Sequence, residues 1–288
     1  MTLKEILQQA TKESWATGHF NASELDQFRA IVEACKEVGS PAIVGTSEGE
    51  RKHIGLTEVV AVRDAFRKDL GIPIFLNADH HKSVAAAKEA IDAGYDSVHI
   101  DLSALSLEEN VKGTKEIVGY ARAKHKNISV EGEVGYFVTE SSKIYKEAFK
   151  IPPESLTKPE EAKRFVEETG VDRLAIAVGN IHGISLNEPD LDIKRIREIR
   201  QLIPEEVALV LHAGSGIPED QIKAAIKAGI ANIHINTELR VAFVNELRKT
   251  LSEELDEVAM YKLDESAIQA MKKLVKEKLK LFGSINKI

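Results

Sequence analysis

The amino-acid sequence predicts an α/β fold, a (β/α)₈ TIM barrel with a C-terminal helical extension, and two observations carry that prediction. Short β-rich runs alternate with helical patterns along the whole 288-residue chain, which is typical of parallel strands covered by helices. Aromatic residues make up 5% of the chain while Ala, Ile, Leu and Val are abundant, which suits buried parallel strands. We expect one domain over residues 1–288, because no low-complexity linker divides the sequence.

Eight runs of apolar and β-branched residues have the length of strands, and they lie at 18–21, 42–46, 74–77, 97–101, 128–133, 174–178, 208–211 and 230–236. Between them, apolar residues recur at helical spacing over 23–38, 56–70, 84–93, 107–123, 159–168, 193–202 and 218–228. A final amphipathic pattern over 263–282 predicts the helical extension. Eight strand-then-helix units favour a TIM barrel over a doubly wound sheet, which usually has fewer strands.

The ends of these elements carry residues that start and stop helices. Glycines follow five of the helices, where a left-handed residue closes the last turn, at Gly39, Gly71, Gly94, Gly170 and Gly229. We expect Ser23, Ser83 and Pro159 to open helices. The longest irregular stretch, 135–157, follows strand five and is expected to be an active-site flap.

The charge pattern argues against two classes of partner. The formal net charge is -7, with both signs interspersed along the helices, so a basic stripe for nucleic acid is lacking. The apolar runs are strand-sized and residues 1–14 hold no apolar signal core, so we expect no membrane segment and a cytoplasmic protein. The single cysteine, Cys35, is expected to be a small buried side chain.

Histidines gather at the carboxyl ends of the predicted strands, where barrel enzymes build their sites. Seven of the nine histidines lie at or beside these ends. His80, His182 and His212 end strands three, six and seven, and three imidazoles with an open fourth position are the arrangement of a catalytic zinc site. Other divalent metals are alternatives to Zn²⁺, and His81 is an alternative ligand to His80.

Asp79 directly precedes His80, so its carboxylate should lie beside the metal without having to coordinate it. A metal that chelates a substrate carbonyl and its adjacent hydroxyl acidifies the carbon-bound proton and stabilises the resulting enediolate. We therefore favour Asp79 as a general base over the alternative that it caps the following helix.

The stretch Gly214-Ser215-Gly216 comes just before Pro218, where a helix is expected to begin. Glycines let backbone N–H groups approach a phosphate, and a helix N-terminus adds favourable partial charge. Strands seven and eight often hold phosphate in barrels, which adds Asn236 and Thr237 as candidates. A plain tight turn is the alternative for the glycine stretch.

Three carboxylates form an acidic sector at strands four and five: Asp101, Glu131 and Glu133. Glu131 and Glu133 face the same side of a strand, and buried carboxylates are costly unless they bind cations or hydrogen-bond donors. We expect them to orient the histidines, with a second metal position as the alternative.

The chain resembles a class II fructose-bisphosphate aldolase nearly from end to end. The motifs that carry the resemblance are Gly18-His19-Phe20-Asn21, Ser47-Glu48-Gly49, Ala78-Asp79-His80, Ile100-Asp101, Glu131-Gly132-Glu133-Val134-Gly135, Gly179-Asn180-Ile181-His182-Gly183, His212-Ala213-Gly214-Ser215-Gly216, Asn236-Thr237-Glu238 and Phe282-Gly283-Ser284. Together these motifs are highly specific.

The resemblance implies a role for each of these motifs. It implies Asp79 as the base, His80, His182 and His212 as zinc ligands, and an alternative metal position lined by Asp101 and Glu133. It also implies phosphate contacts, from Gly183, Ala213, Gly214, Ser215, His234, Asn236 and Thr237. We add Asn21 and Ser47, at the ends of strands one and two, as substrate-binding candidates.

The implied reaction is the reversible cleavage of fructose 1,6-bisphosphate to dihydroxyacetone phosphate and glyceraldehyde 3-phosphate, a step of glycolysis. The resemblance further implies sugar phosphates as the small-molecule partners, a homodimer or homotetramer, and a monovalent cation near the site. A tagatose-bisphosphate or other ketose aldolase and a ketose epimerase are alternatives, because they use the same metal and base. A Schiff-base aldolase would need a site lysine such as Lys82, and a non-catalytic binding barrel is the last alternative.

The chain departs from the family pattern in four places. The loop after strand five lacks the usual acidic stretch, and Glu140 is the possible flap acid. Leu186 and Asn232-Ile233-His234 stand where lysines are common. The C-terminal arginine that often grips the second phosphate has no match in 261–266, and Arg240 and Lys143 are candidate replacements.

Overall fold

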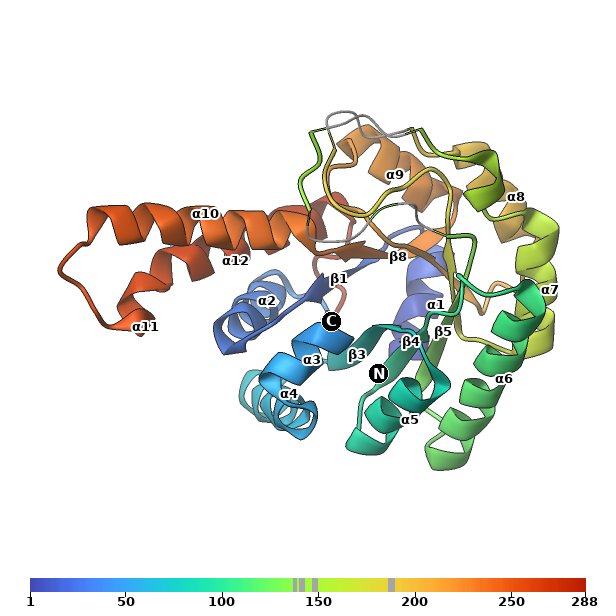
Figure 1. Ribbon diagram of the computed structural model, residues 1–288, viewed down its shortest axis with the longest axis horizontal. Coiled ribbons are helices and arrows are strands. Elements are labelled where there is room, and N and C mark those ends of the chain that lie inside the picture. The colour runs from blue at the N-terminus through green and yellow to red at the C-terminus, as the bar shows by residue number, and fades with distance from the viewer. Residues whose placement is uncertain (137–138, 140–142, 147–149, 186–189) are drawn as a thin grey trace.

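Parallel strands form a closed barrel at the centre of the molecule (Figure 1). The structure, a computed structural model, describes residues 1–136, 139, 143–146, 150–185 and 190–288. Within these residues eight strands follow one another around the ring, and β8 pairs with β1 to close it. They are β1 (Thr17–Asn21), β2 (Ala42–Ser47), β3 (Ile74–His81), β4 (Ser97–Ile100), β5 (Ser129–Val134), β6 (Arg173–Ile176), β7 (Ala208–Leu211) and β8 (Ile230–Ile235). The predicted TIM barrel is confirmed.

Helices cover the outside of the barrel and bury their apolar faces against the strands. They are α2 (Leu25–Val38), α4 (Leu56–Leu70), α5 (Val84–Ala93), α6 (Leu107–Lys124), α7 (Pro159–Thr169), α8 (Ile193–Leu202) and α9 (Glu219–Ala228). Their bounds agree with the sequence prediction to within two residues. Ser23 was wrongly expected to open α2, because the carboxylate of Glu24 is the cap and accepts hydrogen bonds from the N–H groups of Asp26 and Gln27.

A short helix that the sequence analysis missed, α1 (Leu3–Glu13), covers the amino-terminal end of the barrel. Its buried side chains pack against residues near the starts of four strands, in a cluster of Leu3, Ile6, Leu7, Ala10, Trp15, Ile43, Phe75, Ala208 and Ala231. This end of the barrel is therefore filled with apolar side chains. A substrate site has to lie at the other end, where the strands terminate.

The C-terminal part forms a helical arm that projects from the barrel (Figure 1). It consists of α10 (Thr237–Glu253), α11 (Met260–Leu263) and α12 (Glu265–Leu281), and α12 packs on both α10 and α2. The predicted helical extension is confirmed, while α10 was not expected from the sequence. Another unpredicted helix, α3 (Glu48–Ile54), follows β2 directly and lies at the barrel mouth.

The described part of the stretch after β5 includes a short 3-10 helix, η1 (Pro153–Ser155). Another part of this stretch, at Lys143 and Tyr145, pairs with the segment after β6. The N–H of Tyr145 donates to the carbonyl of Ile184 over 2.8 Å, and the N–H of Ile184 donates to the carbonyl of Lys143 over 3.0 Å. The loops after strands five and six therefore meet over the mouth. Among the described residues, no helix combines the length and apolar character that crossing a membrane requires.

Candidate active site

The carboxyl ends of the strands surround a cavity of about 990 Å³. Predicted site residues from all eight strand ends line it: Asn21, Ser47, Asp79, His80, Asp101, Glu133, His182, Gly183, His212, Ala213, Ser215, His234, Asn236 and Thr237. Gly214 lies just behind the lining, and Glu140 falls outside the described residues. The barrel thus brings together side chains that are up to 216 positions apart in the sequence.

Three imidazoles converge at the base of this cavity. The ring centroid of His80 lies 4.5 Å from that of His212 and 5.1 Å from that of His182, and His182 and His212 are 6.5 Å apart. A tetrahedral ion about 2 Å from each coordinating nitrogen would place three such centroids roughly 5 Å apart. The two distances from His80 therefore fit a divalent metal, while His182 and His212 lie farther apart than this spacing.

The charge state of two of these histidines also fits a metal. Burial, reinforced by the nearby His80 imidazole, lowers the pKa of both His182 and His212. A neutral imidazole has a free nitrogen lone pair, which is the form that binds metals. His182 and His212 are therefore neutral over the physiological pH range, and each has a nitrogen lone pair that can bind a metal.

His80 also belongs to a second group of possible metal-binding side chains, together with Asp101 and Glu133, the carboxylates predicted to line an alternative metal position. His80 Nδ1 lies 2.9 Å from Asp101 Oδ2 and 4.0 Å from Glu133 Oε2, and donor atoms of the three residues lie within 4.8 Å of one another. Burial lowers the pKa of His80, but Asp79 and the other carboxylates outweigh burial and raise it. Asp101 thus orients the His80 ring, and the cluster has the composition of a second cation position.

The backbone at His80 is unusual and helps to aim its ring. His80 has a φ of 46°, a left-handed conformation that costs a non-glycine residue about 1 to 2 kcal/mol. The pairing of β3 with β4 shifts register at this point, between Ala78 and His81. The shift separates two adjacent histidines, since His80 lines the cavity whereas His81 is fully buried against the carbonyl of Asp79. This explains why His80 is the better placed ligand.

Asp79 lies beside the imidazoles, and one of its carboxylate oxygens accepts a hydrogen bond. Asn21 donates to Asp79 Oδ2 over 3.0 Å, and His234 Nδ1 lies 3.4 Å from Oδ1. Burial raises the pKa of Asp79, but His80, His234 and His99 outweigh it and hold the pKa well below its usual value. The carboxylate is therefore ionised and able to accept a proton. It does not cap α5, because Ser83 does so by accepting from the N–H of Ala86.

A buried ion pair that the sequence analysis missed supports His212 from below. His212 Nε2 lies 2.6 Å from Glu131 Oε1, and the other carboxylate oxygen lies 2.8 Å from Arg173 Nη1. The side chains of Glu131 and Arg173 are fully buried, and strand register places the two residues side by side. Arg173 keeps Glu131 ionised, so Glu131 accepts from His212 Nε2 and leaves Nδ1 to face the cavity.

Signals for this pair were present in the sequence. Arg173 opens a strand that is otherwise apolar, and a charged residue inside a buried strand requires a partner. Its guanidinium also donates to Asn77 Oδ1 over 2.8 Å, so it connects β6 with β3 across the barrel interior. The expectation that acidic residues orient the histidines therefore has geometric support at both Asp101 and Glu131.

Five of the residues predicted to contact phosphate line the cavity together at the ends of β6, β7 and β8, namely Gly183, Ala213, Ser215, Asn236 and Thr237. The last two stand at the N-terminus of α10, where backbone N–H groups and the helix dipole favour an anion. We refer to these five residues as the phosphate cradle.

The glycine stretch contributes less to this cradle than the sequence suggested. The N–H of Gly214 donates to the carbonyl of His234 over 2.9 Å, and that of Gly216 donates to Glu238 over 2.6 Å. Both groups are therefore engaged within the protein. The start of α9 at Glu219 also lies behind the lining of the cavity, so α10 rather than α9 presents its N-terminus there.

Comparison with known proteins identifies what the chain is similar to. A family model described as fructose-bisphosphate aldolase class-II matches residues 1–287. The YdjI aldolase from Escherichia coli K12 shares 31% identity with a TM-score of 0.83, over 98% of this chain and 97% of that one. A fructose-bisphosphate aldolase from Campylobacter jejuni, at 22% identity, has the same fold, with a TM-score of 0.83 over 99% of this chain and 95% of that one.

Proposed function

The chain belongs to the class II fructose-bisphosphate aldolase family, and from that premise we propose that it cleaves fructose 1,6-bisphosphate reversibly. The products would be dihydroxyacetone phosphate and glyceraldehyde 3-phosphate. Membership of this metal-dependent family makes the protein an aldolase, and the choice of ketose is our proposal. The observation that carries it is the ionised carboxylate of Asp79 beside three converging imidazoles.

The residues of the site divide the reaction between them. His80, His182 and His212 would hold the metal, which we propose to be Zn²⁺, and when bound it withdraws electrons from the substrate carbonyl. In cleavage, the ionised Asp79 takes the proton of the C4 hydroxyl, the C3–C4 bond breaks, and the aldehyde leaves behind an enediolate of the three-carbon phosphate. Asp79 then delivers that proton to C3 of the enediolate, and in condensation the same two transfers run in reverse.

Binding of the three-carbon phosphate positions C3 for this transfer. The phosphate cradle lies at β6 to β8, and Asn21 holds the Asp79 carboxylate in place from β1. The half-buried Asn236 side chain has a buried Oδ1 that lacks a hydrogen-bond donor among the described residues, so it can accept from a substrate hydroxyl. These contacts hold one end of the ketose while its carbonyl lies at the imidazoles.

Metal removal and one substitution test the proposal. A chelator should abolish triose phosphate formation and added Zn²⁺ should restore it. Asp79→Asn should lower kcat roughly 10²- to 10⁴-fold, the usual cost of losing a proton-transfer group. Asp69→Asn, on the exposed outer face of α4, is the matched control and should retain activity. Full activity in chelator or in Asp79→Asn would contradict the proposal, and epimers in place of trioses would indicate an epimerase.

A further inference from the structure

The cavity has a second end, opposite the phosphate cradle. In a ring of eight strands, β3 stands four strands away from β7 and therefore faces it across the mouth. Residues that follow β3 and β4 line this opposite wall: Lys82, Leu102, Ser103, Ala104 and Leu105. A six-carbon ketose held by the cradle at one end, with its carbonyl at the central imidazoles, would extend its other end toward this wall.

Lys82 is the positive charge on this wall. Among the described residues that line the cavity, Lys82 is the sole lysine or arginine. The residues that the structure does not describe include no lysine and no arginine. Its side chain is exposed, and its ammonium group has neither an ion pair nor a hydrogen bond with the described residues. The backbone N–H of Lys82 donates to Glu48 over 2.8 Å, which fixes the start of the side chain beside α3.

The other cations near the mouth are engaged or lie elsewhere. Arg240 pairs with Glu50, which also accepts a hydrogen bond from Asn21. Lys143 is fastened to Ile184 by its backbone, on the side of the phosphate cradle. Both had been candidates for a grip on the second phosphate, and this leaves Lys82 as the cation placed for that task.

We propose that Lys82 binds the phosphate on the aldehyde half of the substrate and so selects phosphorylated aldehydes. The inference rests on the proposed aldol reaction and assigns its second anion site. An ammonium on a flexible four-carbon stem can follow a phosphate as the bond to the other half breaks and the aldehyde moves away. Hydrogen bonds between such a cation and a phosphate are among the stronger polar contacts in proteins.

Condensation of dihydroxyacetone phosphate with different aldehydes tests this role. The measured quantity is kcat/KM for glyceraldehyde 3-phosphate divided by kcat/KM for neutral glyceraldehyde. Lys82→Ala should lower that ratio roughly 10- to 100-fold, the usual effect of losing a charge-assisted hydrogen bond. Lys82→Arg should keep most of the ratio, because the charge is retained. Lys52→Ala, an exposed lysine on α3 outside the cavity lining, is the control and should leave the ratio unchanged.

Four outcomes would overturn the inference. The first is an unchanged ratio in Lys82→Ala, and the second is a larger dependence on Lys82 for a carboxylate-bearing aldehyde than for the phosphate. Covalent trapping of dihydroxyacetone phosphate on Lys82 by borohydride is the third, because Lys82 would then be a nucleophile. If the unsubstituted enzyme condenses neither aldehyde, the proposed function fails and this inference fails with it. The first two outcomes leave the proposed function standing, whereas the third would also contradict its metal-dependent mechanism.

Discussion

At the scale of single residues, the chemistry depends on which charges are compensated inside the barrel. Asp79 is ionised because histidines surround it, and Glu131 is ionised because Arg173 pairs with it. Burial acts against both carboxylates, so each depends on a cationic or hydrogen-bonding neighbour. The site is therefore an electrostatic network in which the proposed metal ligands and the residues that contact them stabilise one another.

This network makes Arg173 important for stability as well as for the position of His212. Arg173→Met should lower the free energy of unfolding by about 3 to 5 kcal/mol, because Glu131 would remain buried without its cation. Chemical denaturation measures the effect. The matched control is Arg164→Met, which removes an exposed ion pair with Glu168 and should cost less than about 1 kcal/mol.

A second substitution separates charge from packing at the same position. Replacing Glu131 as well, in the double variant Arg173→Met and Glu131→Leu, should recover much of the lost stability, since the buried charge is then removed. If Arg173→Met lowered the free energy of unfolding by less than about 1 kcal/mol, the buried charge of Glu131 would not depend on Arg173, and this explanation would be wrong.

At the scale of elements, the strands and the short segments that follow their carboxyl ends place the site residues. The sequence predicted these strands well, because buried parallel strands are short apolar runs and each ends in polar residues. It missed the register shift after Ala78, since a local change in pairing leaves no periodic signal. It missed α1 although Leu3, Ile6, Leu7 and Ala10 have helical spacing, because residues 1–14 were interpreted only as a polar terminus without a signal core.

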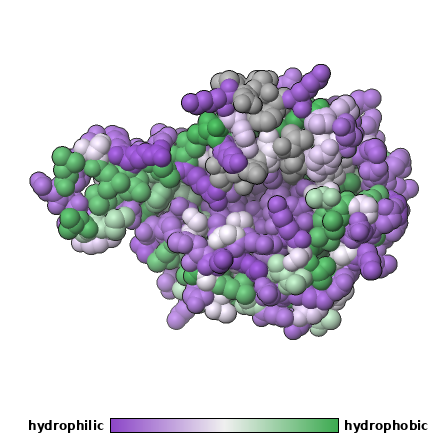
Figure 2. Space-filling model, viewed as in Figure 1, coloured by the Kyte–Doolittle hydropathy of each residue, from purple (hydrophilic) through white to green (hydrophobic). Residues whose placement is uncertain are grey.

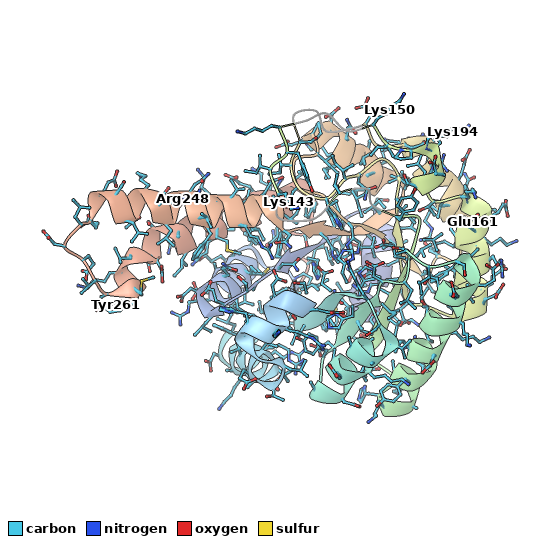
Figure 3. The ribbon with its side chains drawn as sticks, viewed as in Figure 1. Lys143, Lys150, Glu161, Lys194, Arg248 and Tyr261 are labelled. Carbon is cyan, nitrogen blue, oxygen red and sulfur yellow. The ribbon has the colours of Figure 1, made fainter. Side chains whose placement is uncertain are left out.

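The projecting arm exposes large apolar side chains that nothing else in the described part of the chain covers. Its outer end exposes large apolar side chains, Leu251, Leu255, Val258, Met260 and Tyr261, which are visible as a patch in Figure 2 and near the label of Tyr261 in Figure 3. Leu255 and Val258 are 81% and 88% exposed. Contiguous apolar patches of this kind mark interaction surfaces, and we propose that a second copy of the chain covers this one.

Self-association through the arm can be measured directly. The double variant Leu255→Glu and Val258→Glu should raise the dimer dissociation constant about 100-fold or more, because charges would replace buried apolar contacts. Sedimentation velocity over a concentration series gives the constant. The control pair, Lys194→Glu and Glu198→Lys on α8, exchanges exposed charges away from the arm and should leave association unchanged. A monomeric unsubstituted protein, or an undisturbed double variant, would contradict the proposal.

At the scale of the whole molecule, one closed barrel converts scattered polar residues into one site. Strand order alone was enough to predict that His80, His182 and His212 would meet, since the carboxyl ends of barrel strands share one face. The sequence could not give the direction of individual side chains. Gly214 is turned away by its bond to His234, and Lys82, which the sequence offered only as a candidate Schiff-base lysine, lies in the wall of the cavity.

The central claim is that Asp79 moves a proton at carbon beside a metal held by three histidines. Exchange of the C3 hydrogen of dihydroxyacetone phosphate with deuterated water, followed by NMR without any aldehyde, tests that step alone. The metal-loaded protein should exchange one of the two C3 hydrogens stereospecifically, and Asp79→Asn should slow the exchange roughly 10²-fold or more. Absence of exchange in the metal-loaded protein, or an unchanged rate in Asp79→Asn, would contradict the account.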